Sequence, residues 1–249
     1  MRKLALLAVV LVPLVSGCVS SSVSDPGIGS ATIYWRFQSF DYQIAGDFTA
    51  LNSGCLEAGV HEVDLTIRDA RGATAHYQSH SCQASNGVPG AAVNLLPGSY
   101  SYEATAYRGR DHYTADPVFS STGTFTVADG LDTPVDATLD VIPGPQPLLV
   151  LYSKNGVVTC GGVSGVHYAV SDAIGTVEAA TVNCDPYNEL LVRGLGGAGL
   201  TLGSAYSINY LQMLDAGGFS IYERCSVPVV HNGFSAFVDL PPTSTPGCF

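Results

Sequence analysis

The residues of this sequence best suited to chemistry are its histidines, serines and cysteines, and their spacing argues against a catalytic centre. His61-Glu62 begins the H-E-x-x-H pattern of zinc peptidases, but Leu65 stands where the second metal-binding histidine is needed. Ser164 lies between Val163 and Gly165, without the G-x-S-x-G spacing that exposes a nucleophilic serine. The sequence also has no glycine-rich phosphate loop and no EF-hand loop. It therefore predicts no enzyme activity, no cofactor and no metal site.

The other histidines have the patterns of structural or exposed residues. His76 and His80 are four positions apart, which on a straight strand places them on one face about 13 Å apart. We therefore expect two exposed side chains that share no metal ion. His61 and His167 occupy matching positions in two similar segments, which favours a structural role at the start of a strand. His231 precedes an Asn-Gly pair, which is a turn signal.

One loop gathers polar and aromatic side chains, so it is the best candidate for a polar contact site. A solvated hairpin loop is the simpler alternative. The candidate contact residues are Arg108, Arg110, Asp111, His112 and Tyr113.

The N-terminus has the pattern of an export signal. Arg2 and Lys3 precede an apolar run over residues 4–15, and a basic start followed by a short apolar run is typical of a signal peptide. The run is shorter than the roughly 20 residues that a membrane-spanning helix needs. We expect residues 1–17 to be removed.

The end of this run, Leu14-Val15-Ser16-Gly17-Cys18, resembles the lipobox of bacterial lipoproteins. The resemblance implies that Cys18 becomes the mature N-terminus and carries diacylglycerol on its thiol, with two or three acyl chains such as palmitate in all. Two or more acyl chains anchor a protein stably. By the sorting rule of that family, Val19 in place of aspartate implies the outer membrane, on either its periplasmic or its surface face. Residues 18–29 are expected to form a flexible tether.

The chain divides near residues 141–147, VIPGPQP, because three prolines and a glycine make a stiff connector. We expect domains at 30–142 and 147–249. Two similar segments lie on either side, although two unrelated β domains could share such turn residues by chance. The first contains Cys55, Gly59-Val60-His61, Asp69-Ala70-Arg71-Gly72 and Cys82, and the second contains Cys160, Gly165-Val166-His167, Asp172-Ala173-Ile174-Gly175 and Cys184.

The six cysteines beyond Cys18 predict three disulfides, because an even number in an exported chain is typical of an oxidising compartment. None forms a C-x-x-C pair, so a zinc or redox motif has no support. In each half two cysteines with similar spacing enclose a hairpin, and a hairpin brings its two ends together. The remaining two cysteines would attach the C-terminal tail. The predicted pairs are Cys55–Cys82, Cys160–Cys184 and Cys225–Cys248.

Alternating apolar residues predict strands almost throughout. Val63, Leu65 and Ile67 alternate with polar residues before a turn, and turn signals recur along the chain. The fold class predicted is all-β, with two antiparallel immunoglobulin-like β-sandwich domains in tandem. The run from Leu96 to Tyr102 resembles the L-x-x-G-x-Y strand start of transthyretin-like and other immunoglobulin-like accessory modules, which supports the fold class alone.

Composition narrows the range of partners. The formal net charge is −11 and no basic run occurs, so nucleic acid is excluded, because phosphate contacts need clustered Lys and Arg. We expect a membrane-anchored, non-enzymatic lipoprotein serving as a structural or binding module, whose partners are the membrane and an envelope protein or polysaccharide. Two alternatives stay open. Its tyrosines could bind carbohydrate or an envelope polymer, or the chain could be an enzyme of unknown type.

Overall fold

The computed structural model describes residues 27–39, 51–83, 89–108, 116–243 and 248. The lipobox with Cys18, and the predicted contact residues Arg110, Asp111, His112 and Tyr113, lie outside these ranges. Within them the chain is nearly all strand, as predicted, with one short helix, α2 (Cys55–Ala58), and one 3₁₀ turn, η2 (Leu195–Gly197). No helix in the described ranges is long and apolar enough to cross a membrane.

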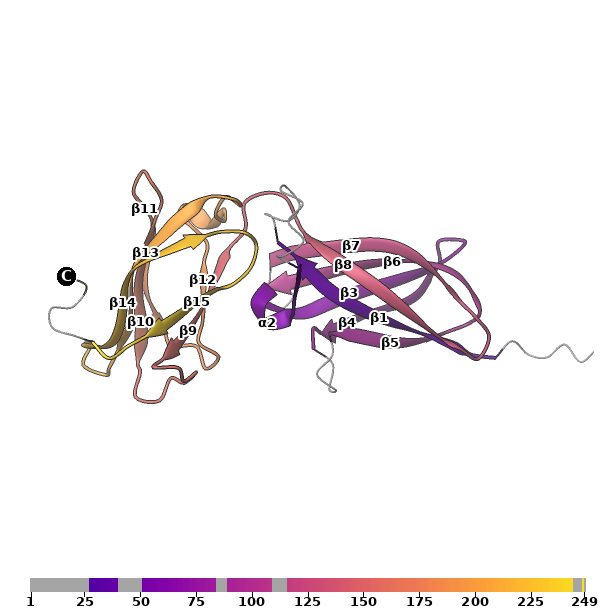
Figure 1. Ribbon diagram of the computed structural model, residues 1–249, viewed down its shortest axis with the longest axis horizontal. Coiled ribbons are helices and arrows are strands. Elements are labelled where there is room, and N and C mark those ends of the chain that lie inside the picture. The colour runs from indigo at the N-terminus through magenta and orange to yellow at the C-terminus, as the bar shows by residue number, and fades with distance from the viewer. Residues whose placement is uncertain (1–26, 40–50, 84–88, 109–115, 244–247, 249) are drawn as a thin grey trace, which may run out of the picture.

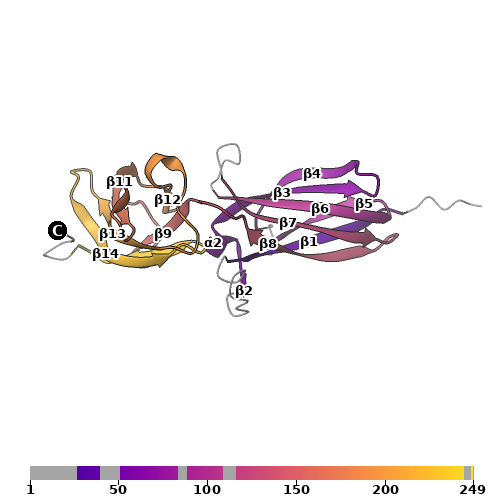
Figure 2. The same cartoon turned by 90° about the horizontal axis from the view of Figure 1, so that it is seen from above.

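The first half of the chain forms one eight-stranded sheet that folds over its own core. The strand order is β2-β1-β8-β7-β6-β3-β4, and β5 also pairs with β1. Figure 2 shows β3, β4 and β6 on one side of this half and β1 and β8 on the other. The strands are β1 (Gly29–Gln38), β2 (Leu51–Ser53), β3 (Val60–Asp69), β4 (Thr74–Ser81), β5 (Gly90–Leu95), β6 (Gly98–Arg108), β7 (Asp116–Val127) and β8 (Asp132–Val141).

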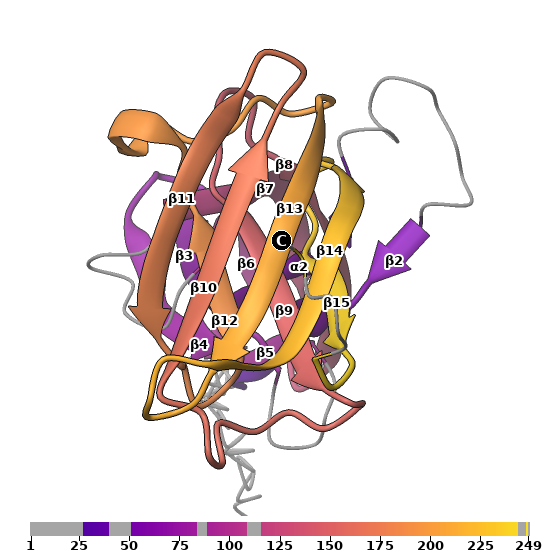
Figure 3. The ribbon, with the colours of Figure 1, turned by 90° about the vertical axis from the view of Figure 1, so that its left-hand side faces the viewer.

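The second half forms two sheets, with orders β11-β10-β13-β14 and β12-β9-β15. Figure 3 looks onto the four-stranded layer, with β9 and β12 behind it. A second hydrophobic cluster fills the space between the layers and includes Val150 of β9, Val170 of β10 and Ile208 of β13. The strands are β9 (Leu148–Lys154), β10 (Gly165–Ser171), β11 (Thr176–Asn183), β12 (Glu189–Val192), β13 (Ala205–Leu214), β14 (Ser220–Val230) and β15 (Ala236–Leu240).

Strand pairing follows the same pattern in both halves. The order β4-β3-β6-β7 corresponds to β11-β10-β13-β14, and β5 pairs with β1 as β12 pairs with β9. In each half the first strand also pairs with the last one in parallel, β1 with β8 and β9 with β15. The prediction of purely antiparallel sheets is therefore wrong for one pair in each half, because alternation specifies the buried face of a strand and not the direction of its neighbour.

The repeated Asp-Ala-x-Gly motif closes corresponding hairpins, β3–β4 and β10–β11. Asp69 accepts a backbone hydrogen bond from Ala73 at 2.9 Å, and Asp172 accepts one from Gly175 at 2.9 Å. These backbone bonds hold the pKa of both carboxyl groups below its usual value. The shared motif therefore forms a side-chain-capped turn in each half.

Three disulfides join the pairs of cysteines that the sequence predicts. The Cα atoms are 5.9 Å apart in Cys55–Cys82, 5.9 Å apart in Cys160–Cys184 and 5.6 Å apart in Cys225–Cys248. The first two pairs enclose the corresponding hairpins. The third connects Cys225 of β14 to Cys248, so it holds Cys248 against the four-stranded layer.

Candidate functional site: a groove between the two halves

The two halves lie end to end (Figure 1), and a buried arginine connects them. Arg108 ends β6, and its side chain is fully buried. Its guanidinium donates hydrogen bonds to the carbonyl oxygens of Ala58, 3.2 Å away, and of Pro147 and Gly233. These acceptors belong to α2, to the connector and to the second half. Arg108 therefore ties three segments together at the junction.

Gln146 and His231 complete the polar part of the junction. Gln146 and Leu200 exchange both backbone hydrogen bonds, at 2.9 and 2.7 Å, and the Gln146 side chain donates to the carbonyl oxygen of Val118 at 3.2 Å. The fully buried His231 ring donates from Nε2 to the carbonyl oxygen of Gln146 at 3.1 Å. The connector is therefore fixed by bonds from both halves.

Apolar contacts also cross the junction. Leu202 belongs by sequence to the second half but joins the hydrophobic cluster of the first half. The rings of Phe119 and Phe234 lie 5.9 Å apart between centroids. At Gly233 a Cβ atom would lie 2.4 Å from Val141, and its φ of +88° is one that glycine adopts readily. The halves therefore pack closely enough to require glycine here.

The outer face of the β12-β9-β15 sheet carries a mixed row of side chains beside this junction. On β9, Tyr152 faces the core, whereas Leu151 faces outward. Leu151 lies opposite Glu189 of β12 on one side and Phe237 of β15 on the other. A carboxylate, an aliphatic chain and an aromatic ring therefore stand side by side across the sheet.

This row forms part of a hollow of about 470 Å³, within the range of small-ligand sites. Leu56 and His61 line it from the first half, and Val158 and Tyr187 line it from loops of the second half. Phe237 is 58% exposed and Tyr187 is 54% exposed. The walls are thus mainly apolar and include two accessible aromatic rings.

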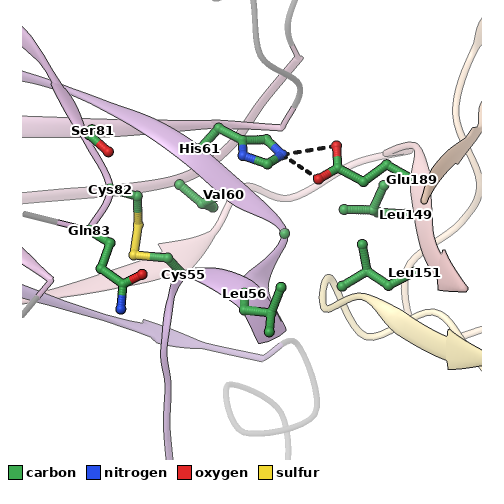
Figure 4. A pocket seen from close by; sticks show the side chains of 11 residues that line it. Cys55, Leu56, Val60, His61, Ser81, Cys82, Gln83, Leu149, Leu151 and Glu189 are labelled. Carbon is green, nitrogen blue, oxygen red and sulfur yellow. Dashed lines mark hydrogen bonds and ion pairs between the residues drawn. A yellow bond between two sulfur atoms is a disulfide. The ribbon is translucent and has the colours of Figure 1, made fainter. Parts of the chain in front are cut away.

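An ion pair between the halves separates this hollow from a smaller one. Nε2 of His61 lies 2.9 Å from Oε1 and 3.0 Å from Oε2 of Glu189 (Figure 4). The smaller hollow, of about 210 Å³, lies next to the Cys55–Cys82 disulfide. His61, Glu189, Leu56 and Leu151 line both hollows, so the two adjoin. Together we call them the interdomain groove.

Hydrogen bonds and burial set the ionisation states of two groups in the interdomain groove, Asp239 and Tyr152. Asp239 accepts hydrogen bonds from the Ser153 hydroxyl at 2.6 Å and the Gly156 amide at 2.7 Å, and these bonds lower the pKa of its carboxyl group. Burial raises the pKa of Tyr152 to about 12, so its hydroxyl stays protonated at neutral pH. The groove thus presents an ionised carboxylate and two aromatic rings on an apolar floor. This arrangement suits binding.

The structure changes the interpretation of three predicted residues. Arg108 is buried and structural, so its prediction as an exposed contact residue is wrong. His76 and His80 are half-buried, and their Nε2 atoms lie 3.2 Å apart. The expected separation of about 13 Å applies to the backbone atoms of the two residues. The two rings reach toward each other, so their Nε2 atoms are much closer. The prediction of two separate, exposed rings is therefore wrong.

His61 does lie at the start of β3, as predicted, but it also contacts Glu189 of the second half. Sequence analysis missed the groove residues Leu151, Glu189 and Phe237. The signal that could have indicated Phe237 is its position on the polar side of an alternating strand, between Ser235 and Asp239. Because the groove joins residues from both halves, no local pattern could assemble it.

No protein-family model matches the sequence, and no curated protein matches it. Among solved structures, the Bacillus anthracis TIE protein is 13% identical with a TM-score of 0.30, over 86% of this chain and 34% of that one. A leucine-rich repeat protein from Bacteroides thetaiotaomicron is 15% identical with a TM-score of 0.28, over 86% and 26%. The fimbrial anchor protein Mfa2 from Porphyromonas gingivalis is 14% identical with a TM-score of 0.31, over 79% and 82%.

This chain thus spans about a third of the first of these proteins and about a quarter of the second. Similarities of this size establish neither a shared fold nor a shared function.

Proposed function

We propose that this chain is a lipid-anchored, non-enzymatic binding module of the bacterial cell envelope. In this proposal Cys18 carries the lipid, and residues 18–29 form the tether. Residues 30–142 and 147–249 form two immunoglobulin-like β-sandwich domains, and the interdomain groove holds the ligand. The lipobox resemblance and the exported pattern of cysteines support the location. The two separate hydrophobic clusters support the division into domains.

The observation that carries the binding role is the row Glu189–Leu151–Phe237 at a fixed junction, where the exposed Phe237 ring borders a buried leucine and a largely covered carboxylate. Phe237 and Tyr187 line one ligand-sized hollow with mainly apolar walls, and such a hollow with a few polar groups is typical of a binding site. Arg108, Gln146 and His231 hold both walls of the groove in place. A preformed groove needs little ordering on binding, which favours affinity.

Carbohydrate is a second candidate ligand class, and the two exposed aromatic rings favour it. Tyr187 and Phe237 line the same hollow as the carboxylates of Glu189 and Asp239. Aromatic faces can stack on sugar rings, and carboxylates can accept hydrogen bonds from sugar hydroxyl groups. An envelope protein remains the main candidate, because the floor and most of the walls are apolar.

The test uses the chain from residue 19 onward, which retains every described residue. This soluble protein is incubated with fractionated outer membranes, periplasmic extract and a panel of envelope glycans, and the same protein after reduction and denaturation is the control. We expect saturable binding of the folded protein to one protein fraction. Saturable binding to a glycan alone would select the second candidate. The absence of saturable binding to all of them would contradict the binding role.

A further inference from the structure

Two histidines lie at the open edge of the first core. Strand β4 is at the end of its sheet, and in the register with β3, His76 lies opposite Ile67 and His80 lies opposite Val63. Ile67 and Val63 are fully buried in the first hydrophobic cluster. The histidines therefore point toward the inner face of the sheet, where β4 leaves the core partly accessible to water.

The two rings face each other through their Nε2 atoms. These atoms are 3.2 Å apart, and the ring centroids are 5.5 Å apart. The nitrogens are thus much closer together than the rings, so they lie between the two centroids. The His80 ring is also 6.3 Å from the ring of Trp35. Two ligand atoms therefore converge on one point beside a tryptophan.

We propose that His76 and His80 form a transition-metal site that binds Zn²⁺, Cu²⁺ or Ni²⁺ through both Nε2 atoms. Zn–N bonds are about 2.0–2.1 Å long, so two of them at a tetrahedral angle separate the nitrogens by about 3.4 Å. The 3.2 Å between the nitrogens is close to this value. Without metal the two Nε2 atoms point at each other in a hydrogen bond, so each ring turns by about 35° to aim its lone pair at a metal ion bound at a tetrahedral angle.

The chemistry of the site selects the class of metal. Imidazole nitrogen suits Zn²⁺, Cu²⁺ and Ni²⁺, whereas Mg²⁺ and Ca²⁺ prefer oxygen ligands. Among the described residues, no group of three or more His, Cys, Asp or Glu side chains could hold a metal. Water would therefore complete the coordination sphere, and the site would be of the open kind.

The surroundings favour the neutral, metal-binding form of both rings. Burial lowers the pKa of His76, and burial followed by the proximity of His76 lowers the pKa of His80. The Asp64 carboxylate acts in the opposite direction on His80, as a smaller effect. Both rings can thus offer an unprotonated Nε2 at neutral pH after one of them moves its proton to Nδ1.

Trp35 provides a direct readout, because it is the single tryptophan of the chain. The chain from residue 19 onward, without a polyhistidine tag, is titrated with Cu²⁺ at pH 7 while tryptophan fluorescence is recorded. Because the His80 ring is 6.3 Å from the Trp35 ring, we expect Cu²⁺ bound at His80 to quench Trp35 far more strongly than Cu²⁺ bound elsewhere on the surface. We expect saturable quenching at one Cu²⁺ per chain, relieved by excess Zn²⁺ and unaffected by Mg²⁺.

Matched variants locate the site. His76→Asn and His80→Asn should each weaken the quenching roughly 100-fold, because loss of one ligand removes the benefit of two linked contacts. His167→Asn, which changes a histidine of the second half, should behave like the wild-type protein. Unaltered quenching in either His76→Asn or His80→Asn would overturn the proposal. If those variants fail to fold, the absence of saturable quenching at one Cu²⁺ per chain in the wild-type protein would overturn it.

Discussion

Arg108, at the end of β6, donates a hydrogen bond to the backbone carbonyl of Gly233, which lies 125 residues further along the chain. The same guanidinium also bonds to the carbonyl oxygens of Ala58 and Pro147. A charged donor on buried carbonyl groups is worth more than a neutral one, and its loss leaves those acceptors unsatisfied. The contact thus joins α2, the connector and the second half through one side chain, beside the bonds of Gln146 and His231 at the same junction.

The first prediction concerns this arginine. Arg108→Met keeps the length of the side chain and removes its donors, and we expect it to lower the free energy of unfolding by about 3 kcal/mol. Arg36→Met is the control, because Arg36 pairs with Asp136 on the surface at 3.0 Å and should contribute less than about 1 kcal/mol. Urea denaturation measures both variants. Equal stability of the two would contradict the role of Arg108.

The second prediction concerns pH. Burial, and next the charge of Arg108, lower the pKa of His231 from 6.5 to about 4. Between these values the unfolded chain binds a proton that the folded chain does not, so the free energy of unfolding falls as the pH falls from 6.5 to 4. The total loss should be about 3 kcal/mol, since one pKa unit corresponds to about 1.4 kcal/mol.

His231→Gln tests this effect, because glutamine can still donate to the Gln146 carbonyl but does not titrate in this range. Denaturation curves at pH 7, 5 and 4 are compared with those of the wild-type protein. The wild-type protein should lose more stability toward pH 4 than the variant does. Parallel losses in the two proteins would show that His231 is not responsible.

The third prediction concerns the C-terminal tail. The Cys225–Cys248 bond closes a loop with a sequence separation of 23 residues, so removing it by Cys225→Ser with Cys248→Ser should lower the free energy of unfolding by roughly 3 kcal/mol. Peptide mapping without reduction should recover the three bonds separately. A bond between the halves, such as Cys82 to Cys160, would refute the map.

The fourth prediction concerns the lipid anchor. Cys18→Ser should abolish incorporation of a palmitate analogue and leave the protein unprocessed or soluble, because serine offers no thiol for diacylglycerol. A matched Cys225→Ser variant, which changes a disulfide cysteine, should still be labelled. Continued labelling and membrane retention of the Cys18→Ser protein would refute the anchor.

Sequence patterns predicted the individual strands well. The alternation of Val63, Leu65 and Ile67 reflects their burial on β3, and the two Asp-Ala-x-Gly motifs form corresponding turns. Two of the cysteine pairs followed from the same spacing, because each of them encloses one hairpin, and the third pair was the two cysteines that remained. These features are local, and a short stretch of sequence contains all the information that they need.

Features that depend on distant segments could not be predicted. The parallel pairing of β1 with β8 cannot be recognised from the alternation of apolar and polar residues in either strand. The sequence around Arg108 is typical of a loop. Its buried role depends on the carbonyl of Gly233, which is 125 residues away in the chain. The predicted distance between His76 and His80 came from the backbone rise per residue alone. Their side chains reach toward each other, so their ring nitrogens are much closer than that distance. The groove needs His61 and Glu189, 128 residues apart, to meet.

Binding by matched phenylalanine variants tests the central claim, that the interdomain groove holds the ligand. Phe237→Ala removes an aromatic wall of the groove, and Phe219→Ala removes a phenylalanine that is 72% exposed in a turn outside it. The affinity of each soluble variant is measured for the envelope fraction that binds the wild-type protein. We expect Phe237→Ala to weaken binding at least about tenfold and Phe219→Ala to leave it unchanged. Wild-type affinity in the Phe237→Ala protein would contradict the claim.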